Sequence, residues 1–120
     1  MTPATTPAAA PGTGGGLFPA RPLAVQAHAL RAAAAFIERT GLAGLSVTAS
    51  DDGIAITVPR FAGSPAARTA AVTYLAILTG APCPRRRDYQ SWAWISTSGR
   101  IAGHDAHIHT TIEPDELDTA

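Results

Sequence analysis

The stretch YQSWAWISTSGRIAGHDAHIHTTIE, residues 89–113, decides how the rest of this chain folds. Its residues alternate between two kinds, which is the period expected of β-strands with one buried face. The first kind is small or apolar and comprises Ala93, Ile95, Thr97, Gly99, Ile101, Ala106, Ile108, Thr110 and Ile112. The second kind, expected on the opposite face, comprises Trp92, Trp94, Ser96, Ser98, Arg100, Asp105, His107, His109, Thr111 and Glu113.

A hairpin of two strands explains this pattern. A turn at Gly103 and His104 pairs Arg100 with His107 and keeps both apolar sets on one face. A rival turn at Ser98 and Gly99 would put Ile95 and Ile101 on opposite faces, and a one-residue slip would expose a whole core face. We therefore predict that the hairpin turns at Gly103 and His104.

A second hairpin is indicated by residues 45–59, LSVTASDDGIAITVP. An Asp-Gly pair between alternating runs is typical of a two-residue turn, so we predict that Asp52 and Gly53 form it, with Ala49 opposite Ile56. Turn chemistry also explains Asp51 and Asp52 better than a metal or catalytic pair does. The core side of this hairpin would hold Leu45, Val47, Ala49, Ile54, Ile56 and Val58.

A helix is predicted before each hairpin. The first runs from Pro22 to Thr40, and its apolar stripe is expected to comprise Leu23, Ala27, Leu30, Ala34 and Ile37. The second opens at Ser64, a capping residue followed by proline, and closes at Thr79 before Gly80. Because this second helix has few polar residues, we expect it to be central in the fold or covered by a second subunit.

The element order α-β-β-α-β-β predicts an α+β fold. Two hairpins and two helices, each with one apolar face, close most simply as a four-stranded antiparallel sheet with both helices packed on one face. We expect residues 1–16 to be a disordered arm of Pro, Thr, Ala and Gly, residues 17–113 to be a single domain, and residues 114–120 to be an acidic tail.

Composition narrows the possible classes of protein. The chain has 120 residues, and all nine of its basic residues are arginine, which suggests a GC-rich bacterial or phage genome. No apolar run is long enough to span a membrane, and no secretory signal is evident, so we expect a cytoplasmic protein without membrane contact. The single cysteine, Cys83, agrees with a reducing compartment.

Charge is unevenly distributed although the net charge is zero. Residues 17–112 carry nine arginines and five acids, whereas residues 113–120 carry four acids and no base. Such a tail either competes with an anionic partner for the arginines or serves only to keep the chain in solution.

Candidate catalytic chemistry is sparse. Asp105, His107 and His109 would share one strand face and could offer three metal ligands, but the chain has no second cluster of this kind. The triplet His109-Thr110-Thr111 resembles one half of the paired His-x-Thr motif of two-histidine phosphoesterases, and the second half is missing. We therefore expect no cofactor and no enzymatic activity, with a metal-dependent hydrolase as a distant alternative.

The outward tryptophans are the strongest indication of function. We predict a small module that binds another protein or a second copy of itself through the open sheet face, because Trp and Arg are frequent interface anchors. The alternative is single-stranded nucleic acid, with bases stacked on Trp92 and Trp94 and phosphates held by arginines. A loop that covers the tryptophans is a third possibility. The candidate binding residues are Trp92, Trp94, Arg100, His107, His109 and the loop residues Arg85, Arg86 and Arg87.

Overall fold

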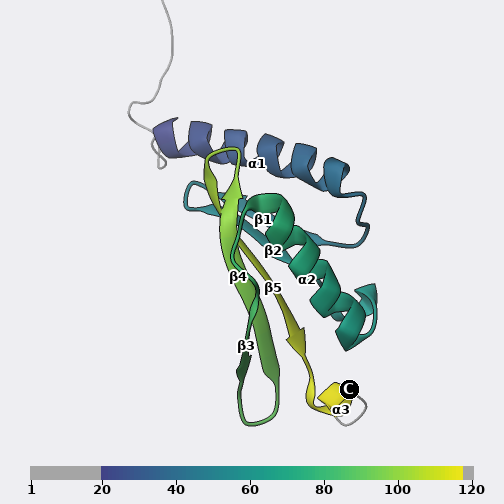
Figure 1. Cartoon of the computed structure of the whole chain (residues 1–120). Helices are drawn as coiled ribbons and strands as arrows, with labels where there is room; N and C mark the ends of the chain where they lie inside the picture. Colours follow the sequence, from purple (N-terminus) through teal and green to yellow (C-terminus); the bar gives the residue numbers. More distant parts are fainter. Residues whose placement is uncertain (1–19, 118–120) are drawn as a thin grey trace, which may run out of the picture.

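The computed structural model describes residues 20–117 and, among them, the side chains of residues 22–116. The elements are α1 (Ala20–Thr40), β1 (Ser46–Ser50), β2 (Gly53–Thr57), the 3-10 helix η1 (Arg60–Ala62), α2 (Pro65–Thr79), β3 (Arg85–Asp88), β4 (Ala93–Ile101), β5 (His104–Ile112) and α3 (Pro114–Leu117). Figure 1 shows their arrangement. The arm predicted for residues 1–16 lies outside the described residues.

The fold is α+β, but its sheet is mixed and has five strands in the order β1-β2-β5-β4-β3. The prediction of four antiparallel strands is therefore wrong in two respects. β2 and β5, which join the two hairpins, run parallel, with Ile56 beside Ile108. The fifth strand, β3, consists of Arg85, Arg86, Arg87 and Asp88, all exposed. Charged residues protect an edge strand from aggregation, and they also make it look like a loop in the sequence.

Both hairpins turn one residue earlier than predicted. In the first, Val47 lies opposite Ile56, so the turn falls at Asp51 and Asp52. In the second, Arg100 lies opposite Asp105, and Ala102 and Gly103 form the turn. The pairing shifts by two residues in each case, which leaves every side chain on its predicted face. Alternation alone cannot distinguish two registers that differ by an even number of residues.

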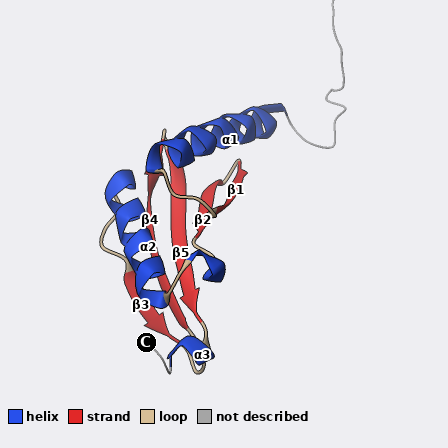
Figure 2. Ribbon diagram, turned by 90° about the vertical axis from the view of Figure 1, so that its right-hand side faces the viewer, coloured by secondary structure: helices blue, strands red, loops and turns tan. Residues whose placement is uncertain are grey.

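α1 and α2 pack on the same face of the sheet, α1 mainly over β1 and α2 over β4 and β5 (Figure 2). The stripe predicted for α1 is wrong for its leucines, because Leu23 and Leu30 are 60% and 52% exposed, whereas Ile37 packs against the core. The helix instead buries Ala29, Ala33 and Phe36. Small alanines let the helix lie close to the sheet while Phe36 fills the remaining space, and a count of large apolar residues does not reveal this choice.

α2 begins and ends as predicted. The Ser64 hydroxyl accepts a hydrogen bond from the amide of Ala67, Pro65 occupies the first turn, and Gly80 closes the helix with φ of 68°. Within residues 20–117, none of the helices combines the length and the apolar character that spanning a bilayer requires.

The folded chain continues past residue 113. α3 brings Glu116 against Arg68 of α2, whose guanidinium also donates hydrogen bonds to the carbonyl oxygens of Gly63 and Thr111. Among the described acids of this stretch, Asp115 is also paired, because it binds Arg60.

Candidate binding face

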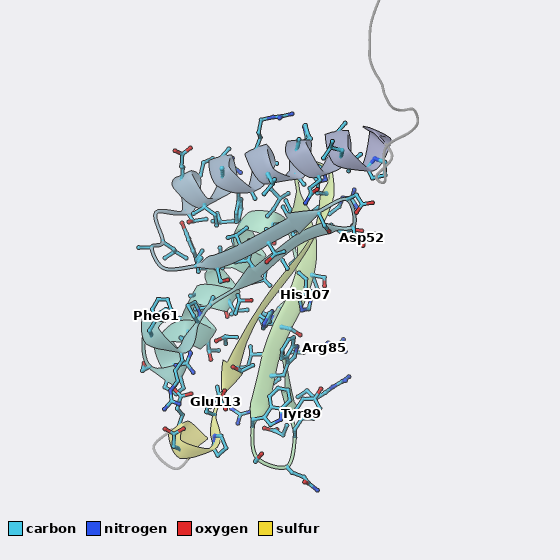
Figure 3. The ribbon with its side chains drawn as sticks, turned by 180° about the vertical axis from the view of Figure 1, so that it is seen from behind. Asp52, Phe61, Arg85, Tyr89, His107 and Glu113 are labelled. Carbon is cyan, nitrogen blue, oxygen red and sulfur yellow. The ribbon has the colours of Figure 1, made fainter. Side chains whose placement is uncertain are left out.

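The face of the sheet opposite α1 and α2 carries the candidate site. Figure 3 looks onto this face, with the strands in front of α2, α1 across the top, and Arg85, Tyr89 and His107 along the sheet. No described helix covers it, so the side chains that alternate with the core residues of β4 and β5 meet solvent. We call this surface the open face.

A row of aromatic rings runs along the open face. Tyr89 stacks on Trp92 with ring centroids 4.2 Å apart, and Trp92 meets the edge of Trp94 at 6.1 Å. Trp94 stacks in turn on His109, with centroids 4.2 Å apart and ring planes 13° from parallel. His107 follows, 5.5 Å from His109. The open face thus presents a continuous line of flat rings contributed by β4, β5 and the turn before β4.

Histidine 109 is the most enclosed member of this row. Its Nε2 lies 3.3 Å from the hydroxyl of Thr57, and no described group hydrogen-bonds its Nδ1. Burial, and secondly the nearby His107, lower the pKa of His109 below its ordinary value of 6.5. Both effects favour the neutral form of the ring that stacks on Trp94.

Two arginines of β3 lie beside Trp94. Arg87 is paired with Trp94 across the strands and Arg85 with Ser96, which places both on the open face. Within residues 20–117, neither makes a hydrogen bond or an ion pair. They border a hollow of about 580 Å³ lined by Pro82, Cys83, Arg85, Arg86, Arg87, Tyr89, Trp94, Ser96, Thr97 and Ser98. Cationic and aromatic side chains thus surround one concave surface.

The other two candidate arginines are differently placed. Arg86 is paired with the buried Ile95, so its side chain leaves the strand on the helix side, and its Nε donates to Asp88 at 2.9 Å. Arg100 is on the open face but donates to Asp105 at 2.8 Å. The loop predicted for Arg85, Arg86 and Arg87 is therefore a strand that divides these residues between two faces.

The candidate metal ligands are not assembled. Asp105 is held by Arg100, and the hydroxyl of Ser98 lies 3.5 Å from Nδ1 of His107. In the part of the chain from residue 20 to 117, no three His, Cys, Asp or Glu side chains are grouped to hold a metal ion. His109 turns to Trp94 instead of to Asp105.

Sequence reasoning missed two contacts. Tyr89 joins the aromatic row because its amide donates to the carbonyl of Trp92 across a tight turn, and the polar pair Gln90 and Ser91 was the available signal. His28 of α1 lies with its Nδ1 2.6 Å from Nε2 of His104. No sequence signal connects these two histidines, which are brought together only by packing.

Comparison with protein-family models, with curated proteins and with solved structures gave no match.

Proposed function

We propose that this protein is a non-enzymatic binding module whose open face takes single-stranded nucleic acid. The observation that carries the proposal is the position of Arg85 and Arg87 along a hollow that Trp94 also lines, since neither cation makes a hydrogen bond or ion pair within residues 20–117. Proteins that hold single strands combine this pair of features, a positive groove for the phosphates and aromatic rings for the bases.

The position of the acidic residues also supports this reading over the predicted protein partner. Asp115 and Glu116 are bound by Arg60 and Arg68 at the end of the sheet near α3. Asp88 is bound by Arg86. These carboxylates are therefore engaged elsewhere and do not neutralise Arg85 and Arg87.

Fluorescence anisotropy with a labelled oligothymidylate tests the proposal. We expect binding that weakens with salt at a slope of about −1.4, since each neutralised phosphate contributes about −0.7 on a single strand. Changing Arg85 and Arg87 together to Ser should flatten this slope. Changing Trp94 to Ala should weaken binding by about 1–3 kcal/mol for each stacked base that is lost.

Arg86→Ser is the matched control, because Arg86 also borders the hollow but its side chain leaves β3 on the helix side and its guanidinium is held by Asp88. It should leave the slope unchanged. If oligonucleotides do not bind at low salt, or if Arg86→Ser weakens binding as much as the other two changes, the proposed site is wrong.

A protein partner on the same face is the second candidate function. Its support is that Trp92 and Trp94 are partly buried and already ordered by their neighbours, as interface anchors are. Binding to a protein that depends on Trp94, with no affinity for oligonucleotides, would favour this candidate.

A further inference from the structure

We propose that the outer face of α2 is an interface with a second copy of this chain, in which the two α2 helices pack antiparallel. α2 is apolar on both sides. Its inner side contributes Val72 and Leu75 to the core, while on its outer side Ile77 is 72% exposed and Tyr74 and Leu78 are exposed as well. A helix that is apolar all round is normally covered all round.

The described chain covers only one side of α2. Figure 1 shows α2 in front of the strands with no other described element over it. The sequence left two explanations for this apolar helix, a central position or a second subunit. Because α2 lies in an outer layer, the central position is excluded for the described fold.

The outer face of α2 contains both a projection and a hollow. Ile77 projects near the C-terminal end of the helix. A groove of about 780 Å³ lies towards the N-terminal end and is lined by Ser64, Pro65, Ala66, Thr69, Ala70, Thr73, Arg86 and Ile112. Ala70 precedes Ile77 by about two helical turns, so both point outward from the same side.

Antiparallel pairing fits each projection into the opposite hollow. If Ile77 of one copy lies against Ala70 of the other, then Ala70 of the first lies against Ile77 of the second. A two-fold axis between Thr73 and Tyr74 produces both contacts at once, which is the self-complementary arrangement that a symmetric dimer requires.

Charge also favours a second copy over an unlike partner. The only charged residue of α2 is Arg68, which is buried and bound to Glu116. The outer face of the helix therefore brings no like charges together when it meets itself, and Arg86 at the border of the groove is already paired with Asp88, so the surface offers no ion pair to select another protein. A standard interface buries about 800 Å² on each partner. One helix face is smaller, so we expect a dimer with a dissociation constant in the micromolar range.

Sedimentation of the full chain over a micromolar concentration range tests the interface. We expect the wild-type chain to dimerise and Ile77→Glu to be monomeric, with circular dichroism and melting temperature unchanged because the side chain is exposed. Leu30→Glu is the matched control, since Leu30 is a similarly exposed leucine on α1. It should leave the dimer intact.

A charge pair tests the antiparallel register. Ala70→Arg alone should also be monomeric. A mixture of the I77E and A70R chains should form a heterodimer, because the new carboxylate then faces the new guanidinium across the axis, and high salt should dissociate it. Two monomeric variants that do not recombine would overturn the register. A monomeric wild-type chain would overturn the interface. So would a dimer that Leu30→Glu or Trp94→Ser dissociates while Ile77→Glu leaves it intact.

The interface is independent of the proposed function. α2 and the open face lie on opposite sides of the sheet, so a dimer through α2 leaves both open faces accessible. Monomeric I77E should therefore bind a short oligonucleotide with the same affinity per chain as the wild type.

Discussion

The guanidinium of Arg68, which is 1% exposed, donates to both carboxylate oxygens of Glu116 at 2.8 and 2.9 Å. The amide of Glu113 donates to the same carboxylate at 3.0 Å. This pair attaches the last described turn of the chain to the start of α2, and it gives the buried arginine the partners that a desolvated charge requires.

Arg68→Met should therefore destabilise the fold by about 3–5 kcal/mol, since it leaves a carboxylate and several carbonyls without their donor. Arg60→Met is the control. Arg60 forms its ion pair with Asp115 at the exposed surface, where such pairs contribute little. Urea unfolding measures both changes, and equal losses in the two variants would contradict the structural role of Arg68.

Acid should weaken the same contact. The hydrogen bonds from Arg68 and from the Glu113 amide lower the pKa of Glu116 from its ordinary value of 4.5 to about 2. A carboxyl with a lowered pKa stabilises the fold above its unfolded pKa, and this contribution is lost as the pH falls from about 4.5 towards 2. We expect stability to decline over this window, and the decline should be smaller in Glu116→Gln. A variant whose acid profile matches that of the wild type would assign the decline to other carboxyls.

Ala102→Asn should stabilise the protein by about 0.5–1 kcal/mol. Ala102 has φ of 50° and Gly103 has φ of 86°, so both central residues of the turn adopt the left-handed conformation that Asn tolerates better than Ala. In the register predicted from sequence, residue 102 would instead belong to the strand, where Asn is unfavourable. A loss of stability on this substitution, measured by urea unfolding, would argue for the register with its turn at Gly103 and His104.

His109 should titrate below pH 6.5 in an NMR experiment that follows its ring protons. Burial is the larger cause of its lowered pKa and the charge of His107 the smaller. His107→Gln should therefore raise the pKa of His109 without restoring the ordinary value. As the pH falls, His109 is protonated in the unfolded chain before it is protonated in the folded chain. The contribution of His109 to stability is therefore present above pH 6.5 and declines below it. An unshifted pKa would show that the ring is open to solvent and not stacked under Trp94.

The sequence by itself determined which residues face the core in both hairpins. Period-two alternation is a local property of the strand, so Ile108 and Ile56 could be assigned to the core and Trp94 and His107 to the opposite face without any knowledge of the fold. The ends of α2 were equally local, since Ser64 and Gly80 act on the backbone beside them.

Tertiary structure decided the rest. The pairing of β2 with β5 depends on which chain segments meet, and residue periodicity carries no information about that choice. The side of α1 that is buried depends on how closely alanines can approach the sheet, and this overruled the larger leucines. Strand β3 forms because β4 offers it an edge. Since side chains alternate between the two faces of a strand, Arg86 lies on the opposite face of the sheet from Arg85 and Arg87. The candidate site is therefore made of locally predictable residues, and only long-range packing determines which of them lie together.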